Sequence, residues 1–218
     1  NCKIVVADPR RTRTAAKSDH YVSLRPGSDV AFIWGILWHV FGNQWEDKGF
    51  IRQRVFGMEE IREEVAKWNP AEVERVTGVS EEDVYQTAKL LSDNRPGCIV
   101  WCMGGTQHTT GNNNTRAYCV LELALGNIGK SGGGANIFRG HDNVQGATDL
   151  GVLSDTLPGY YGLSEGSWRH WSKVWEVDFD WIKGRFDDNA YGGQKPMNSA
   201  GIPVSRWVDG VLENKDNI

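Results

Sequence analysis

The sequence predicts an α/β fold, in which a Rossmann-like parallel sheet with flanking helices is joined to part of an adjoining α/β domain with long irregular segments. Three observations predict it. Short β-branched runs alternate with helical segments, a glycine-rich turn connects one such run to an apolar helix, and periodic patterning fades after Asp149. With 218 residues, 39% of them apolar, the chain can bury a core. We place a boundary near Arg139, giving domains at 1–139 and 140–218.

The first part of the chain predicts two strands and a buried helix. Lys3–Asp8 is a short β-branched run, and Tyr21–Leu24 is a second one that the turn residues RPGSD end. Ser28 or Asp29 is a suitable N-cap for a helix over the next residues. Val30–Phe41 is apolar almost all round, which is typical of a helix buried inside a layered domain.

Three amphipathic segments then predict helices that cover this core. Phe56–Lys67 is charged on one side. Pro70 stands at a first helical position behind Asn69, and Ser80 with Asp83 forms a weak capping box before the next apolar periodicity. We interpret all three as structural.

A strand, a glycine turn and a helix come next, in that order. Gly97–Gly105 (GCIVWCMGG) reads as a strand that runs into TQHTTGNNN, and Thr115–Leu125 reads as an apolar helix. In open α/β sheets this unit cradles phosphate groups, because ligands collect at the carboxyl ends of the strands. There is no GxGxxG and no GxxxxGKS/T, so neither a nicotinamide fingerprint nor a P-loop is present.

Charge and hydropathy exclude several classes of partner. The net charge of −4 comes from acidic and basic residues mixed along the chain, which disfavours nucleic-acid binding. No run approaches the roughly 18 apolar residues of a membrane span, so we expect no direct membrane insertion. The chain begins at Asn1 and opens almost directly on a strand, from which we expect a piece of a longer protein.

The cysteines predict no metal site. None of the four forms a CxxC pair. Cys98 and Cys102 flank an apolar run in which alternation puts both on one face of a strand, so we expect them to be small buried hydrophobic residues. We predict no side-chain metal ligand in this chain, and buried thiols of this kind do not indicate the compartment.

Two carboxylates indicate a nucleotide. Asp8 comes directly after a strand, and Asp29 follows a glycine turn after the next one. A carboxylate in such a place can accept two hydrogen bonds from a guanine edge or a ribose. Taken alone, Asp8 is more simply a turn-forming Asp-Pro. Together with the MGGTQ turn, the pair favours a nucleotide that carries a diphosphate.

The segment NIFRGHDNVQGATDLG, from Asn136 to Gly151, is the strongest candidate site. Glycines and side chains with several hydrogen-bonding atoms concentrate in this way where a backbone lies against a large polar ligand. Arg139 could be a salt-bridge partner, but an arginine beside glycine and among amides favours two-pronged binding of a planar carboxylate. His108 and His141 are the histidines of interest. We expect structural roles for His20, His39 and His170.

These motifs resemble the catalytic subunit of the molybdenum- or tungsten-dependent formate dehydrogenases of the molybdopterin oxidoreductase superfamily. The likeness covers nearly the whole chain and is weakest after Ser167. It is carried by IVVADPRRTRTAAKSDHYVSLRPGSD, the helix after it, TGVSEEDVYQTAKLL, WCMGGTQHTTGNNNTRAYCVLELALGNIGKSGGGANIFRGHDNVQGATDLG and LPGYYG.

The resemblance implies a particular cofactor and its contacts. Family members hold the metal between two molybdopterin guanine dinucleotides, so residues 1–139 would bind that cofactor and residues 140–218 would line the active-site funnel. Asp8 and Asp29 would recognise guanosine by hydrogen bonds. The implied cofactor contacts are Asp8, Arg10, Gly27, Asp29, Met103, Gly104, Gly105, Thr106, Gln107, His108, Arg139, Gly140, Asn143, Gln145 and Gly146.

The resemblance also implies the chemistry. Arg139 matches the arginine that orients formate beside the metal, where formate is oxidised to carbon dioxide and two electrons pass to the metal. His141 stands where other members carry glutamine. It could shuttle the released proton, or only fix a pterin or the substrate pocket.

Several parts of such an enzyme would lie outside this chain. They are the 4Fe–4S cluster, the cysteine or selenocysteine metal ligand followed by histidine, and the carboxyl-terminal cofactor domain, so we expect this chain alone to be inactive. The implied partners are formate, an iron–sulfur subunit and a membrane cytochrome subunit, with Trp168–Ile218 as a contact surface. RGHDN is most similar to respiratory, periplasmic members, and a cytoplasmic location is the alternative. The sequence leaves open another molybdopterin oxidoreductase, of nitrate or polysulfide reductase type, and a non-catalytic cofactor-binding module.

Overall fold

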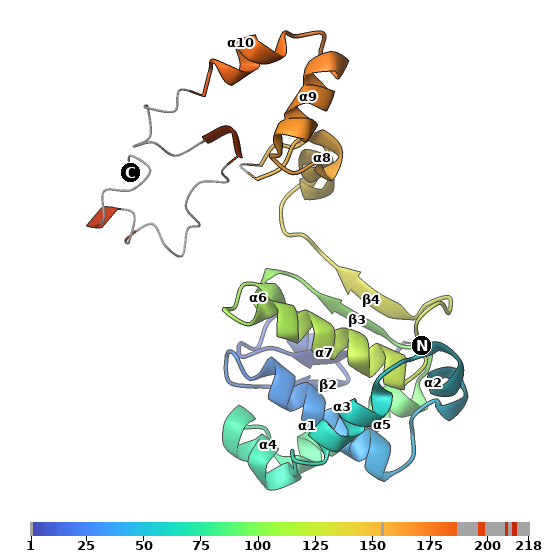
Figure 1. Cartoon of the computed structure of the whole chain (residues 1–218). Coiled ribbons are helices and arrows are strands. Elements are labelled where there is room, and N and C mark those ends of the chain that lie inside the picture. Colours follow the sequence, from blue (N-terminus) through green and yellow to red (C-terminus); the bar gives the residue numbers. More distant parts are fainter. Residues whose placement is uncertain (1, 154, 187–195, 199–207, 209–210, 213–218) are drawn as a thin grey trace. The chain divides into compact units, whose positions relative to one another are not determined.

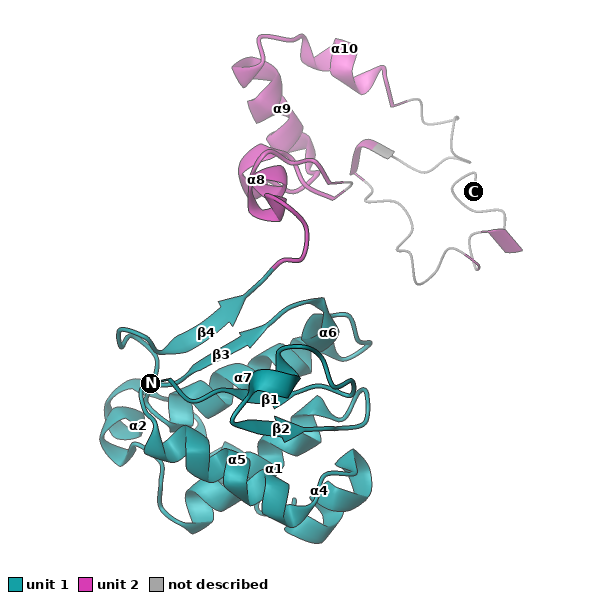
Figure 2. Cartoon of the chain, turned by 180° about the vertical axis from the view of Figure 1, so that it is seen from behind, with its two compact units in different colours: residues 1–138 teal, residues 139–218 magenta. Residues whose placement is uncertain are grey.

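The protein is described by a computed structural model that covers residues 2–153, 155–186, 196–198, 208 and 211–212. It comprises two compact units, residues 1–138 and residues 139–218 (Figure 2). Arg139 is therefore the first residue of the second unit.

The strands of the first unit form two parallel pairs. β1 (Val5–Ala7) pairs with β2 (His20–Val22), and β3 (Cys98–Trp101) pairs with β4 (Gly134–Ile137). The register of the second pair places Cys98 opposite Gly134 and Trp101 opposite Ile137. The prediction of an α/β fold with parallel strands is confirmed. In the described residues, the expected single sheet is instead two sheets of two strands each.

The helices of the first unit pack around α1, which is buried on almost every side. Its side chains Ile36, Leu37 and Val40 are at most 1% exposed, as its all-round apolar sequence predicts. Helices α4, α5 and α7 lie against it (Figure 1). The bounds are α1 (Asp29–Gly42), α2 (Lys48–Arg54), α3 (Met58–Val65), α4 (Pro70–Thr77), α5 (Glu81–Asp93), α6 (Met103–Thr106), α7 (Gly111–Ala124) and the 3-10 turn η1 (Ala15–Lys17).

Two of the predicted helix caps are confirmed. The side chain of Asn69 accepts a hydrogen bond from the backbone N–H of Glu72 at 3.1 Å, and Ser80 accepts one from Asp83 at 3.2 Å. Ser28 precedes α1, but its hydroxyl donates to the carbonyl of Arg25 at 2.6 Å instead of capping the helix. Helix α2, which we did not predict, is capped by Asp47.

The strand–turn–helix unit differs from its prediction in detail. β3 ends at Trp101, and the residues after Cys102 form the short helix α6. Helix α7 begins at Gly111, a turn earlier than expected, where a Cβ atom would lie 1.9 Å from the carbonyl oxygen of Thr106. Only glycine allows this approach of the two segments. The buried Asn114 secures it by donating to the carbonyl of Gly105 at 2.9 Å.

The prediction that Cys98 and Cys102 are buried is wrong. Cys98 is exposed and Cys102 is half-buried. The side chains of Ile99 and Trp101 pack against the core, whereas Cys98 and Val100 face the other way, where no described helix of the first unit covers them. Alternation correctly separates the two faces of a strand, but it does not identify the buried one.

Helix α7 carries a buried carboxylate beneath β3 and β4. Glu122 is 1% exposed, and its Oε2 atom has no hydrogen-bond partner among the described residues, like the Oδ1 atom of nearby Asn127. Burial raises the pKa of Glu122 to about 7, against the opposing effect of hydrogen bonds from Asn127 and from the backbone of Ile99 and Gly134. The neutral carboxyl group is therefore the form that the fold favours.

The second unit consists of short elements. They are α8 (Val144–Asp149), the 3-10 turn η2 (Pro158–Tyr160), α9 (Glu165–Val174), α10 (Phe179–Lys183) and the 3-10 turn η3 (Pro196–Asn198). Gly151 approaches the chain at η2 so closely that a Cβ atom would lie 2.6 Å from the backbone nitrogen of Pro158. Among the described residues of both units, no helix is long and apolar enough to cross a membrane.

Candidate functional site

The predicted site residues belong to both units. Asp8, Arg10, Gly27, Asp29 and Met103–His108 lie in the first unit, and the residues from Arg139 to Gly146 lie in the second. The structure brings together several members of each set.

Asp8 is held in a turn at the carboxyl end of β1. Its Oδ1 atom accepts a hydrogen bond from the backbone N–H of Arg10 at 2.7 Å, and its carbonyl oxygen accepts one from the hydroxyl of Tyr21 at 2.9 Å. Both the turn role and the position directly after a strand are therefore present. The second carboxylate oxygen accepts no hydrogen bond from the described part of the chain.

Asp29 lies in the first turn of α1 rather than at a strand end. Its Oδ1 atom accepts a hydrogen bond from the hydroxyl of Tyr118 at 2.8 Å, across 89 positions of sequence. Burial, and then this hydrogen bond, raise the pKa of Tyr118 above its ordinary range, so the phenol stays a donor. The Tyr118 ring also lies against Trp101, with 5.1 Å between the ring centroids.

Tyr118 connects Asp29 to the MGGTQ turn. A Cβ atom on Gly105 would lie 2.8 Å from the hydroxyl oxygen of Tyr118, so a larger residue at position 105 would displace the donor to Asp29. Two predicted cofactor residues are thus brought together by a side chain that we did not predict. A single tyrosine in an apolar helix gives no sequence signal of such a role.

The MGGTQ turn presents open backbone. A Cβ atom on Gly104 would meet no atom within 4 Å, and Met103, Thr106 and Gln107 are exposed. His108 folds back, with its Nε2 atom 2.8 Å from the carbonyl oxygen of Gly104. Gly104 is therefore open to solvent, whereas Gly105 packs closely against Tyr118.

Gly27 and Arg10 are the remaining predicted contacts of the first unit. Gly27 has a φ of +82° with no atom within 4 Å of its missing Cβ, so glycine is explained here by backbone conformation. The Arg10 side chain is exposed.

In the second unit, Arg139 is exposed and bound by neutral groups. One terminal nitrogen donates to the Oε1 atom of Gln145 at 2.9 Å, and the other donates to the hydroxyl of Thr148 at 3.3 Å. Among the residues that the structure describes, no carboxylate forms an ion pair with Arg139. The guanidinium has more N–H donors than these contacts use.

The turn after Arg139 is shaped by Asn143 and Gly146. Asn143 adopts a left-handed conformation with φ of 50°, and its Oδ1 atom accepts from the N–H of Gly146 at 3.2 Å as the N-cap of α8. A Cβ atom on Gly146 would lie 2.5 Å from that oxygen, so a larger residue would displace the Asn143 side chain from its capping position. Gly140 also has a positive φ, of 86°, and His141 beside it is exposed.

The other histidines contact neighbouring residues, although His170 is itself exposed. The Nε2 atom of His20 is 3.2 Å from the carbonyl oxygen of Asp83, and His170 stacks on Tyr161 with ring centroids 5.0 Å apart. His39 is 5% exposed, and burial lowers its pKa. These contacts agree with the structural roles that the sequence predicts for them.

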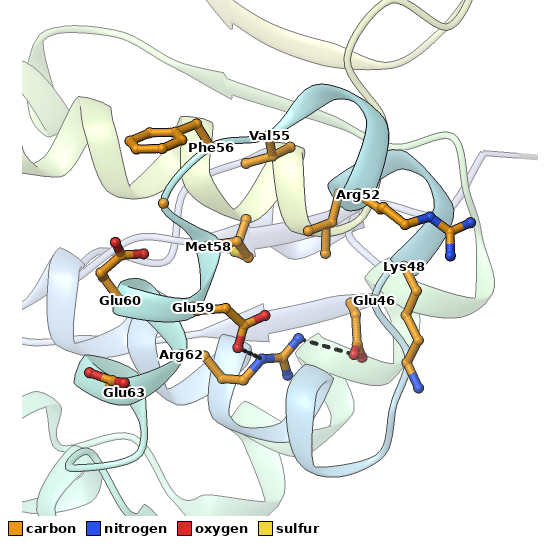
Figure 3. A pocket seen from close by; sticks show the side chains of 12 residues that line it. Glu46, Lys48, Arg52, Val55, Phe56, Met58, Glu59, Glu60, Arg62 and Glu63 are labelled. Carbon is orange, nitrogen blue, oxygen red and sulfur yellow. Dashed lines mark hydrogen bonds and ion pairs between the residues drawn. The ribbon is translucent and has the colours of Figure 1, made fainter.

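A hollow of about 770 Å³ in the first unit contains none of the predicted site residues (Figure 3). It lies over α2, α3 and the loop between them. Arg62 at its base is paired with Glu46 at 3.2 Å and with Glu59 at 3.5 Å. Because four glutamates line the hollow against three cationic side chains, it carries no signal for a phosphate-bearing ligand. In the described parts of the chain, no three His, Cys, Asp or Glu side chains are grouped as metal ligands.

Comparison with known proteins shows the family to which the chain belongs. Residues 1–175 match the family model described as Molybdopterin oxidoreductase. The chain belongs to this family.

The relatives include formate dehydrogenases. The chain is 38% identical over 178 residues to the F420-dependent formate dehydrogenase subunit alpha of Methanocaldococcus jannaschii, covering 82% of this chain and 26% of that protein. It is 37% identical over 177 residues to formate dehydrogenase H of Escherichia coli, covering 81% of this chain and 25% of that protein. The chain thus spans about a quarter of the length of these relatives.

A solved structure shares the fold. The acetylene hydratase of Pelobacter acetylenicus has a TM-score of 0.57 to this chain and is 29% identical, over 59% of this chain and 18% of that one. Because this structural relative is named as a hydratase, the shared fold does not by itself identify the reaction.

Proposed function

We propose that the chain is part of the catalytic subunit of a formate dehydrogenase. That protein would oxidise formate to carbon dioxide at a molybdenum or tungsten centre held by two molybdopterin guanine dinucleotides, and pass two electrons to iron–sulfur partners. The observation that carries the proposal is the state of Arg139. Its guanidinium is exposed, is bound only by neutral groups among the described residues, and lies in the part of the chain that matches formate dehydrogenases.

The residues of the first unit fit the cofactor. Gly104 and Gly27 leave open backbone against which a diphosphate or a pterin can lie. Asp8 and Asp29 each use one carboxylate oxygen inside the protein, which leaves the other to accept from a guanine or a ribose. When bound, the metal with its pterins supplies the acceptor for two electrons.

The chain's own contribution would be orientation. The free N–H donors of Arg139 match the planar geometry of a carboxylate, so formate would be held with its C–H bond turned away from the guanidinium. His141 lies two residues further on and is exposed, so it can exchange a proton with solvent. We propose it as the group that carries the released proton.

Further parts of the proposal concern the protein around this chain. We propose a 4Fe–4S cluster, an iron–sulfur electron-transfer subunit and a membrane cytochrome subunit, as the resemblance implies. They would remove the two electrons released from each formate. The similarity of RGHDN to respiratory members supports a periplasmic location. The expected contact surface, Trp168–Ile218, lies only partly within the described residues.

The test is metal analysis and formate-dependent dye reduction on the intact protein with its cofactor. We expect molybdenum or tungsten, and formate oxidation that falls by more than about 100-fold in Arg139→Ala without loss of cofactor. The control is Arg75→Ala on α4, which removes only an exposed ion pair with Glu72. Normal turnover in Arg139→Ala would refute the role of this residue.

The same assay separates the alternatives. A loaded protein that reduces nitrate or polysulfide but ignores formate would be another oxidoreductase of this family. A loaded protein that is inert towards all three would be a non-catalytic cofactor-binding module.

A further inference from the structure

Arg139 is the first member of a chain of hydrogen bonds within the second unit. Gln145 accepts from Arg139 through Oε1, and its Nε2 atom donates to Asp149 at 3.0 Å and to the hydroxyl of Tyr160. The Tyr160 hydroxyl in turn donates to Asp149. Asp149 and Tyr160 therefore bind the far end of the amide that faces Arg139.

The chemistry of the two ends fixes the orientation of the Gln145 amide. A guanidinium only donates hydrogen bonds, so it requires the amide oxygen. An ionised carboxylate only accepts them, so Asp149 requires the amide NH₂ group. Turning the amide over would place donors against donors at Arg139 and acceptors against acceptors at Asp149.

Tyr160 stays protonated for this role. Its hydrogen bond to Asp149 raises the pKa of the phenol, so the hydroxyl remains a donor to the carboxylate. Tyr160 has a φ of 63°, unusual for a residue with a side chain, and the close approach of Gly151 to Pro158 holds η2 against the end of α8. The backbone conformation thus places the Tyr160 hydroxyl within hydrogen-bonding distance of Gln145 and Asp149.

A second contact fixes the other side of the guanidinium. Thr148 is buried, and its hydroxyl donates to the carbonyl of Val144 at 2.8 Å, which leaves the hydroxyl oxygen to accept from Arg139. With both terminal nitrogens bound, one by Gln145 and the other by Thr148, the plane of the guanidinium is set.

We propose that Asp149 and Tyr160 are positioning residues for formate, acting through Gln145 to hold Arg139 in the orientation that binds a carboxylate. This inference rests on the proposed function of Arg139. Neither residue needs to touch the substrate. Their effect is to make the amide oxygen, rather than the amide NH₂ group, the permanent neighbour of the guanidinium.

The experiment compares Asp149→Leu with Asp149→Asn in the intact, cofactor-loaded protein. Leucine removes the acceptor that fixes the amide NH₂ group, so Gln145 is no longer held against Arg139, and we expect the KM for formate to rise roughly tenfold, with a smaller change in kcat. Asparagine keeps an acceptor oxygen and should restore KM to within about threefold. The inhibition constant of acetate, a carboxylate without an oxidisable C–H bond, should rise in parallel with KM in the leucine variant.

A tyrosine pair gives a matched control. Tyr160→Phe should raise KM and the acetate inhibition constant, whereas Tyr161→Phe keeps its ring contacts with His170 and Trp171 and should change neither. Metal content and melting temperature are measured on every variant. Equal damage from Asp149→Leu and Asp149→Asn, or an unchanged KM in both Asp149→Leu and Tyr160→Phe, would overturn the inference.

A double-mutant cycle with Arg139→Lys links the network to Arg139. A lysine cannot bind a carboxylate through two parallel hydrogen bonds, so Arg139→Lys should itself raise KM. Adding Asp149→Leu to Arg139→Lys should then raise KM little further. Independent, additive effects of the two changes would overturn the inference. If Arg139→Lys is harmful while Asp149→Leu and Tyr160→Phe are harmless, the inference fails and the proposed function stands. If Arg139→Lys leaves formate kinetics unchanged, the proposed role of Arg139 fails and this inference falls with it.

Discussion

The two units hold their candidate site residues in different ways. In the first unit, Asp29 is bound by Tyr118 from a helix 89 positions away, within the packing of a buried core. In the second unit, Arg139 is bound by residues no more than nine positions away, on an exposed surface. Changes at the packed positions of the first unit should therefore act mainly on stability, and changes around Arg139 mainly on substrate binding.

The strongest test of this contrast is a glycine pair in the first unit. Gly111→Ala would force a Cβ atom to within 1.9 Å of the Thr106 carbonyl oxygen, so we expect a loss of more than about 3 kcal/mol in unfolding free energy, or failure to fold. Gly104→Ala meets no protein atom within 4 Å, so its stability should be unchanged while bound cofactor falls. Urea unfolding and metal analysis measure the two effects. Equal stability of the two variants would contradict the close packing at Gly111.

A pH series on Glu122→Gln tests the buried core of the same unit. Because the pKa of Glu122 is raised from 4.5 to about 7, the folded protein keeps a proton that the unfolded chain loses first. Stability should therefore fall as pH rises from about 4.5 to 7 and then level off, by roughly 3 kcal/mol in all. Glutamine does not titrate, so the variant should lack this slope and be more stable than the parent at pH 8. Parallel curves would contradict the assignment.

Two tyrosines allow the units to be compared by the same chemical change. Tyr118→Phe leaves the Asp29 carboxylate without a partly buried donor and should lower the unfolding free energy by about 1–2 kcal/mol. Tyr160 lies on an exposed surface. The melting temperature of the Tyr160→Phe variant should therefore stay close to that of the parent, while its KM for formate rises. The reverse pattern, with stability lost only in Tyr160→Phe, would break the contrast.

The smallest expected effect is at His141. Replacement by Gln should shift the pH profile of kcat/KM for formate, because an imidazole can accept and release a proton and an amide cannot. Stability should not change, since the side chain is exposed. A superimposable profile would remove His141 from proton transfer.

These contrasts explain what the sequence could predict. A run that is apolar all round is sufficient to predict α1, and apolar periodicity with local capping residues is sufficient for α4 and α5, because such signals are contained within one helix. The strand β4 was missed, since a glycine-rich segment has low strand propensity and gains its place by pairing with β3. The predicted burial of Cys98 is wrong, because the alternation of residues along a strand does not say which face of that strand a helix covers.

The candidate site divides in the same way. Arg139, Asn143, Gln145 and Gly146 stand close together in sequence, so their association could be predicted from composition. Tyr118 could not, since its contact with Asp29 depends on how α7 packs against α1. Thr148 and Tyr160 complete the Arg139 network through the fold of α8 onto η2, and no spacing rule indicates that fold.

The parallel pairing of β3 and β4 makes the short connection from α7 to β4, residues 125–133, intolerant of insertions and deletions. At its start the N–H of Asn127 donates to the carbonyl of Glu122 at 3.0 Å, and at its end a Cβ atom on Gly133 would lie 2.4 Å from the carbonyl oxygen of Asn127 while Gly134 lies opposite Cys98. Removing one residue would slip β4 by one position and exchange its two faces. Related proteins should therefore vary in length elsewhere, while this connection keeps a constant number of residues.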